Sequence, residues 1–400
     1  MFKWFKNIGP GALIAAAFIG PGTVTLCTLA GVNFGYTLLW AMTLSIVATV
    51  VLQEMAVRVG IITQKGLAEV IKEQISSVFL RKFVIILILA AIVVGNAAYE
   101  AGNISGASLG ISAIFDKSTF NYFPILIGGI AFVLLFIGNY KILERSLITL
   151  VLLMSFSFIV TAIITKPNFE LIFKGMFIPS FPENSMLTII GLIGTTVVPY
   201  NLFLHASLVK ERWKLKSDLK YAKKDTLISI ILGGFVSMSI IIAATSINAV
   251  SIRNGADLAK GLEPLYGSFA KYFLGIGMFA AGITSAITAP LAASFVAKSC
   301  FGWSDSLKSI KFRVVWIFIL IIGVLFSSLQ VNPIEIIKFA QVSNGILLPI
   351  VALFLIWVVN RISVMGEFKN TRNQNMISGI ILLITLILGF KSILKVFQLL

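Results

Sequence analysis

Two short interruptions break otherwise apolar stretches of this sequence and carry the residues best placed to do chemistry. They are residues 20–23 (Gly-Pro-Gly-Thr) and residues 198–201 (Val-Pro-Tyr-Asn). Proline lacks an N–H and disfavours helix at the residue before it, so each interruption frees backbone polar groups. In apolar surroundings such groups persist where they face a cavity or a ligand. We therefore expect both interruptions to line a polar binding site, with two ordinary proline kinks as the alternative.

Two ionisable side chains, Glu100 and His205, also lie inside apolar stretches. A carboxyl group in such a place is a functional hypothesis by default, and an imidazole titrates near physiological pH. Both residues are therefore candidates for proton exchange. The alternatives are a structural hydrogen bond or ion pair for Glu100 and a neutral, hydrogen-bonded core histidine for His205.

The composition shows what kind of molecule must position these residues. The chain has 400 residues, of which 58% are hydrophobic and 12% charged, with a mean hydropathy of +1.00. A soluble domain carries about 25% charged residues. This excludes a soluble enzyme, a disordered protein and a nucleic-acid binder. Apolar runs of roughly twenty residues instead predict an all-α polytopic membrane protein, with the lipid bilayer as its partner.

The apolar runs predict eleven transmembrane spans with short connections, and thus one membrane domain over residues 1–400. The spans are 10–31, 35–57, 83–112, 122–138, 142–164, 186–208, 226–247, 273–297, 314–329, 334–358 and 375–397. Residues 65–75 form an amphipathic connector. Cys27 and Cys300 lie far apart and indicate no disulfide framework, and a lone histidine cannot form a histidine-rich metal site.

Basic residues orient the chain in the membrane. Most of the 32 lysines and arginines fall in alternate connections, beginning with the N-terminal tail. The positive-inside rule then places the N-terminus in the cytoplasm and, with eleven spans, the C-terminus outside. Residues 210–224 form the densest group. Simple orientation explains this group, and a second role in binding lipid headgroups stays open.

The two interruptions occupy corresponding places in two blocks of five spans. Because five is odd, the second block enters the membrane from the opposite side. Such inverted repeats are typical of secondary transporters, which bind substrate at midplane between two discontinuous helices. We therefore predict repeats over residues 8–164 and 186–358, with an extra helix at 375–397.

Two local patterns add structural expectations. Gly102, Gly106 and Gly110 recur every four residues and predict close helix packing. Glu54 and Arg58 have the i,i+4 spacing of an ion pair on a helix surface.

Several of these residues carry a resemblance to a known family. Residues 199–205 (Pro-Tyr-Asn-Leu-Phe-Leu-His) look like the Met-Pro-His-Asn-Leu-Phe-Leu-His signature of the NRAMP divalent-metal transporters, and residues 280–288 follow that family's eighth-span pattern. Gln341 and the Leu348-Pro349 pair also fit. The resemblance implies a LeuT-type fold, secondary transport by alternating access, no enzymatic activity and no cofactor.

The resemblance does not extend to the metal ligands. The family's first-span Asp and Asn and its sixth-span Met fall at Gly20, Thr23 and Val198, so the metal ligands of this chain are unknown. Tyr200 replaces a family histidine. Among the family's polar sixth-span positions, Asn201 and His205 match.

The residues of the family's proton route are also present in part in this sequence. Glu100 corresponds to the family's third-span glutamate, whereas the aspartate usually found one turn earlier falls at Ala97. The relay that the resemblance implies is therefore incomplete, and proton coupling is an open question.

The expected substrate site is drawn from three spans. Its residues are Gly20, Gly22, Thr23, Thr196, Val198, Tyr200, Asn201 and Gln341. Because its donors are neutral, a hydrated cation such as Mg²⁺ suits it better than Mn²⁺ or Fe²⁺. The alternative is an amino or carboxylic acid whose carboxylate meets the backbone N–H groups at Gly22 and Thr23.

A channel or a non-transporting membrane protein is a further alternative, although no filter sequence supports a channel. Substrate identity, transport direction, oligomeric state and resting conformation stay undetermined by the sequence.

Overall fold

The computed structural model describes residues 11, 19–115, 122–138, 141–247, 252–303, 308–329 and 331–396, and throughout these ranges its regular structure is entirely helical. The first part of the first expected span, residues 12–18, lies outside the described residues. So do residues 1–10 of the N-terminal tail.

Each expected span has a counterpart among the helices. The membrane helices are α2 (Pro21–Phe34), α3 (Leu39–Thr63), α5 (Val78–Phe115), α6 (Phe123–Ile137), α7 (Lys141–Ile164), α9 (Met186–Thr196) with α10 (Pro199–Arg212), α11 (Leu219–Ala244), α14 (Ala270–Phe301), α15 (Ile310–Ser327), α16 (Pro333–Val359) and α18 (Arg372–Val396). Short helices connect them: α4 (Leu67–Glu73), α8 (Phe169–Phe177), η2 (Lys216–Asp218), α12 (Gly255–Ala259), η3 (Lys260–Leu262), α13 (Glu263–Tyr266), η4 (Gly267–Phe269), α17 (Ile362–Met365) and η5 (Gly366–Phe368).

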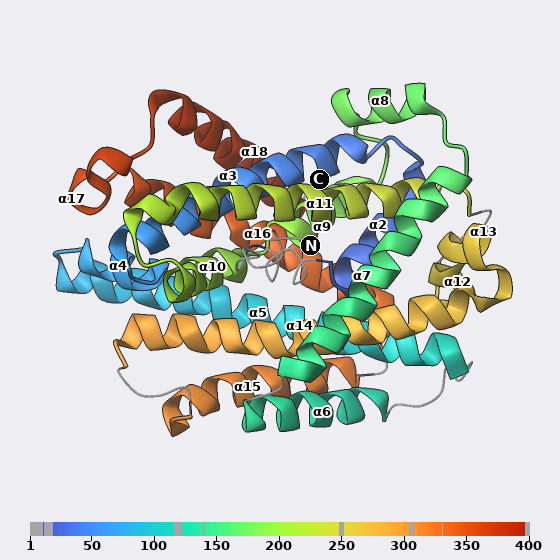
Figure 1. Ribbon diagram of the computed structural model, residues 1–400, viewed down its shortest axis with the longest axis horizontal. Helices are drawn as coiled ribbons and strands as arrows, with labels where there is room; N and C mark the ends of the chain where they lie inside the picture. Colours follow the sequence, from blue (N-terminus) through green and yellow to red (C-terminus); the bar gives the residue numbers. More distant parts are fainter. Residues whose placement is uncertain are drawn as a thin grey trace, which may run out of the picture.

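The long helices run roughly side by side between two ends of the molecule (Figure 1). Helices α4 and α17 lie at one end, and α8, α12 and α13 lie at the other. Alternate connections therefore collect at opposite ends, as the span count predicts. The expected connector at 65–75 is confirmed as α4. Beside it, Lys65 binds Glu73 with Nζ 2.7 Å from Oε2, and this hydrogen bond raises the pKa of the Lys65 ammonium.

The outward faces of these helices suit a bilayer. Eight helical segments of the described chain are long and apolar enough to cross a membrane. Large apolar side chains stay exposed on outer helices, including Phe136 (51%), Phe156 (64%) and Phe318 (52%). Such a surface would be costly in water but matches lipid tails. The chain is a multi-pass membrane protein, while the orientation of its termini stays a prediction.

The glycine stripe on α5 brings three other elements close to this helix. Gly102 faces Ala340 of α16, Gly106 faces Pro21 of α2, and Gly110 faces the Gly275 backbone of α14. A side chain at any of these glycines would crowd its partner. The predicted packing role is confirmed, and α5 is a central scaffold helix.

A second glycine seam joins α9 to α16. A Cβ at Gly194 would overlap the Gln341 carbonyl oxygen, and a Cβ at Gly345 would lie 2.8 Å from the Ile190 carbonyl oxygen. Both obstacles are backbone atoms, which cannot rotate away. The half-helix before the second interruption is therefore fixed against α16.

Gly194→Ala tests this seam. The added methyl group is expected to lower the free energy of unfolding by about 1–3 kcal/mol, because it forces the backbones apart. Gly129→Ala on α6 is the matched control, since a Cβ there meets nothing within 4 Å. Thermal unfolding in detergent measures both variants. Equal midpoints would contradict the close backbone contact.

The Glu54–Arg58 ion pair involves a buried arginine, whereas we expected the pair on a helix surface. The pair exists, with Arg58 Nη2 3.0 Å from Glu54 Oε2, but Arg58 is only 3% exposed. Arg58 also donates to the Phe368 carbonyl (2.8 Å) and to Asn370 Oδ1 (2.6 Å). Lys223 of α11 pairs with Glu54 at 2.8 Å. The predicted surface pair is thus part of a buried network joining α3, α11 and the segment before α18.

Candidate substrate site

Helix α2 begins at the first interruption. Gly20 is its N-cap with φ −102° and ψ −175°, and Pro21 is the first helical residue. Gly106 packs against Pro21, and Gly22 packs against the Gln341 side-chain amide. The N–H group of Gly22 lies in the first turn, where an α-helix supplies no acceptor. This end of α2 therefore presents hydrogen-bond donors and partial positive charge.

The second interruption separates α9 from α10. Val197 and Val198 have ψ angles of 71° and 120°, outside the helical range. Pro199 opens α10 and has no N–H, so the Thr195 carbonyl lacks its usual helical donor. The chain leaves the helical conformation here instead of merely bending. An ordinary proline kink is therefore excluded at this position.

Gln341 of α16 lies between the two broken helices. Its side-chain amide packs on Gly22 of α2, and its backbone carbonyl packs on Gly194 of α9. Gln341 is 1% exposed, and among the described residues its Oε1 has no hydrogen-bond partner. The structure thus brings together candidates from three spans that are far apart in the sequence.

Asn201 on the first turn of α10 is the most conspicuous polar group of the site. It is fully buried, yet neither Oδ1 nor Nδ2 meets a partner in the described part of the chain. Leaving a buried polar group unpaired costs about 1–3 kcal/mol, so native proteins seldom keep one idly. A position that lacks both partners is well suited to a ligand.

Among the other candidates, the buried Tyr200 hydroxyl also meets no hydrogen-bond partner in the described residues. The Tyr200 ring meets Tyr99 of α5 edge-on, with ring centroids 5.5 Å apart. Thr196 donates to the Leu192 carbonyl at 3.4 Å, so its hydroxyl is already engaged within α9. Thr23 and Val198 are buried.

The positions that correspond to the family's ligands supply neither an anionic nor a soft side chain, although Met42 Sδ of α3 accepts a hydrogen bond from Thr196 at 3.7 Å. The described residues contain no group of three or more His, Cys, Asp or Glu that could hold a metal ion. The positions of the three expected family ligands hold Gly20, Thr23 and Val198, which offer a backbone carbonyl, a hydroxyl and an apolar side chain. What the site offers a cation is neutral oxygen. What it offers an anion is the N-terminus of α2 and that of α10.

Glu100 lies close to the site but outside the interruptions. Its side chain is fully buried, and its Oε2 accepts a hydrogen bond from Asn103 Nδ2 at 3.3 Å. Its Oε1 has no partner within the ranges described above. Gly323 of α15 packs directly on the Glu100 side chain. The adjacent Tyr99 contacts Tyr200 of the site, whereas Glu100 itself faces α15.

His205 lies one turn beyond Asn201 on α10. Its Nδ1 is 2.8 Å from Gln53 Oε1 of α3, and the ring is fully buried. Its Nε2 has no partner in the described residues. The structure therefore supports the hydrogen-bonded core histidine that we gave as an alternative, and it leaves one ring nitrogen for a ligand or a proton.

Two residues near the site were not among the candidates, Gln53 and Tyr99, whereas Asn344 belongs to the neutral polar residues that the sequence leaves for the site. Asn344 of α16 is 1% exposed, and its Nδ2 has no partner in the part of the chain that is described. Gln53 interrupts an apolar span with an amide, which is the signal that could have identified it.

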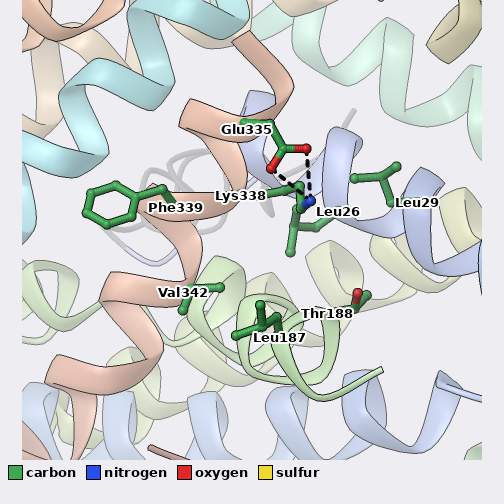
Figure 2. A pocket seen from close by; sticks show the side chains of 8 residues that line it. All are labelled: Leu26, Leu29, Leu187, Thr188, Glu335, Lys338, Phe339 and Val342. Carbon is green, nitrogen blue, oxygen red and sulfur yellow. Dashed lines mark hydrogen bonds and ion pairs between the residues drawn. The ribbon is translucent and has the colours of Figure 1, made fainter. Parts of the chain in front are cut away.

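Two cavities lie toward opposite ends of the helices that carry the site. One of about 210 Å³ lies between α2, α9 and α16, where Leu26, Leu187 and Val342 form apolar walls (Figure 2). The ion pair between Glu335 and Lys338, 3.0 Å apart, lies beside these walls. Val342 follows Gln341 along α16, but Gln341 itself does not line this cavity.

The second cavity, of about 730 Å³, lies at the far ends of α10 and α14, next to α4. Ser207 and Phe295 lie in its wall, and lysines and glutamates surround them. The residues of α10 in this wall continue the helix that starts at the second interruption. Neither cavity is lined by a residue of the two interruptions.

This arrangement of helices, with a buried polar site at two interruptions, defines a LeuT-type membrane fold. A family model described as natural resistance-associated macrophage protein-like matches residues 11–395. The chain belongs to this family, which confirms the resemblance found in the sequence.

Known relatives are transporters rather than enzymes. The divalent metal cation transporter MntH of Caldanaerobacter subterraneus subsp. tengcongensis is 25% identical over 399 residues, covering 97% of this chain and 92% of that protein. The protein of the same name from Staphylococcus saprophyticus is 28% identical over 427 residues, covering 99% and 93%.

Solved structures agree on the fold. A mutant of the Eremococcus coleocola manganese transporter matches with a TM-score of 0.79 at 20% identity, covering 98% of this chain and 87% of that chain. The structure of MhsT in complex with L-phenylalanine matches with a TM-score of 0.61 at 15% identity, covering 95% and 98%. At these identities the likeness concerns fold alone.

Proposed function

We propose that this protein is a secondary transporter that moves a divalent metal cation across the membrane by alternating access. Two features support the proposal: membership of a family whose relatives bear the name divalent metal cation transporter, and a buried polar site between two broken helices. Within this proposal, the substrate-binding residues are Gly20, Gly22, Thr23, Thr196, Val198, Tyr200, Asn201 and Gln341.

The observation that carries the proposal is the unpaired amide of Asn201. Its Oδ1 is a hard oxygen donor at the start of α10, beside the break that frees backbone carbonyls. Gln341 Oε1, also buried and unpaired, lies on the helix that packs against both half-helices. A cation held between them would satisfy groups that the protein itself leaves unpaired.

Within the divalent cations, we infer that Mg²⁺ fits better than Mn²⁺ or Fe²⁺. Mg²⁺ keeps several of its waters when it binds, and neutral oxygens can hold those waters by hydrogen bonds. Softer ions gain from thiolate, thioether or imidazole ligands. Val198 stands where the family has a thioether, and Gly20 where it has a carboxylate.

A second candidate substrate is a small organic acid. The N-termini of α2 and α10 both open at the interruptions, and a carboxylate would meet N–H donors there. The residues of the two interruptions include no acidic side chain that would repel it. This candidate keeps the transport mechanism and changes only the cargo.

Uptake into proteoliposomes tests these candidates together. Entry of Mg²⁺, of Mn²⁺ and of a panel of amino and carboxylic acids is measured over a range of concentrations, with Asn201→Ala as the control. The proposal predicts saturable Mg²⁺ uptake by the native protein and no such uptake by the Asn201→Ala variant. Saturable uptake of an organic acid alone would select the second candidate. Uptake that never saturates would indicate a channel and overturn both.

Glu100→Gln tests proton coupling. The amide keeps the shape and polarity of the carboxyl group but cannot release a proton. If Glu100 couples transport, an inward proton gradient accelerates cargo uptake by the native protein, and the variant loses this acceleration while still binding the cargo. His205→Gln is the comparison variant. An unchanged response to the gradient in Glu100→Gln would assign this residue a purely structural role.

A further inference from the structure

The segment of residues 210–224 comprises the end of α10, the connection to α11 and the beginning of α11, and it has an unusual charge for its length. We call it the basic loop. It contains seven lysines and arginines but only two acidic residues, Glu211 and Asp218. The charge is presented outward, because Lys214, Lys216, Lys220 and Lys224 are all exposed. A surface of this kind attracts anions.

Two large side chains among these lysines are also exposed. Leu215 is 64% exposed and Tyr221 is 54% exposed. Leu215 is apolar and Tyr221 is amphipathic, so exposure of these side chains to water contributes little favourable free energy. At a membrane surface they can enter the headgroup layer, where tyrosine is enriched, while the lysine ammonium groups meet phosphates.

The loop is held firmly on the protein. Trp213 and Leu219 are buried in a small cluster with Val57 and Ile61 of α3. Gln64 at the end of α3 donates to the Trp213 carbonyl at 3.2 Å. The lysines between these anchors are thus presented by a fixed scaffold, which lowers the ordering cost of binding.

We propose that the basic loop is a docking surface for anionic phospholipid headgroups of the cytoplasmic leaflet. The partner follows from charge complementarity and from the exposed Leu215 and Tyr221, which a soluble anion would not need. The loop is continuous with α10, the half-helix that carries Asn201. Its Lys223 also pairs with Glu54 in the network around Arg58. Bound lipid therefore acts on the end of the helix that begins at the substrate site.

Lipid binding to the purified full-length protein tests this surface. A fluorescent phosphatidylglycerol is displaced by unlabelled phosphatidylglycerol or phosphatidylcholine, in the native protein and in the triple variant Lys214→Gln, Lys216→Gln, Lys220→Gln. The matched control removes three lysines from the opposite end, Lys166→Gln, Lys174→Gln and Lys271→Gln. We expect the native protein to prefer phosphatidylglycerol, the triple variant to bind it at least about tenfold more weakly, and the control to be unchanged.

Several outcomes would overturn the proposal. The native protein could bind the two lipids with equal affinity, or both triple variants could lose the same amount of phosphatidylglycerol affinity. Either result would mean that the charge of the basic loop serves only to orient the protein in the membrane. Full displacement by millimolar inorganic phosphate would indicate a small-anion site instead of a lipid surface. Should the triple variant not fold, Leu215→Ser replaces it. This variant removes the apolar contact and is expected to weaken phosphatidylglycerol binding without changing charge, and unchanged binding would count against the proposal.

Discussion

The combined substitutions Gly20→Asp, Thr23→Asn and Val198→Met are expected to raise the affinity for Mn²⁺ at least about tenfold. They place a carboxylate, an amide oxygen and a thioether at the two interruptions, at the positions where the resemblance puts the family's ligands. Gly20 has φ −102°, an angle that any L-residue can adopt, so the aspartate introduces no backbone strain there. Isothermal titration of the purified variant with Mn²⁺ and Mg²⁺ measures the change.

The native protein and the single variant Thr23→Asn are the controls for this experiment. Thr23→Asn adds a neutral oxygen but no charge, so it is expected to change Mn²⁺ affinity much less than the triple variant. If the native protein already binds Mn²⁺ in the micromolar range, the preference for Mg²⁺ is wrong. Neutral donors then suffice for the ordinary cargo of the relatives.

Asn201→Leu is expected to raise the stability of the protein and to lower its transport activity. Leucine has nearly the shape of asparagine and no polar atoms, so it removes two unpaired groups from a buried position. The free energy of unfolding should rise by about 1–3 kcal/mol, which is the cost of leaving such a group unpaired. Cargo uptake should fall at least about tenfold, because a donor and an acceptor of the site are lost.

Thermal unfolding and proteoliposome uptake measure these two effects on the same preparation. Leu202→Met is the matched control, since the neighbouring Leu202 is also fully buried but carries no polar group. This exchange conserves volume and is expected to change stability by less than about 1.5 kcal/mol. A destabilised Asn201→Leu would mean that the amide is paired within the protein, and the assignment of Asn201 to cargo binding would fail.

Most of the fold could be predicted from the sequence because the bilayer imposes a length on each apolar run. Every expected span overlaps a helix, and the break at Pro199 was predictable from proline chemistry alone. The short helices α8, α12 and α13 escaped prediction. They lie in connections, where no apolar run of fixed length is required.

The candidate site was less predictable. Local chemistry identifies Asn201 and the two interruptions, but the contact of Gln341 with Gly22 and Gly194 depends on tertiary packing across three spans. The same limit explains Arg58. Its i,i+4 partner Glu54 is visible in the sequence, whereas the Phe368 carbonyl that buries the pair is 310 residues away.

This distance has a consequence for how the chain is made. Arg58 belongs to the second helix to be synthesised, but its acceptors on Phe368 and Asn370 emerge only when the chain is almost complete. Until then Glu54 alone can balance a guanidinium that ends up buried, which is an unfavourable arrangement. The early helices therefore lack the Phe368 and Asn370 acceptors of Arg58 until the last part of the chain has been synthesised. A chain truncated before residue 366 would leave Arg58 with Glu54 but without its Phe368 and Asn370 acceptors, which distinguishes a finished protein from an unfinished one.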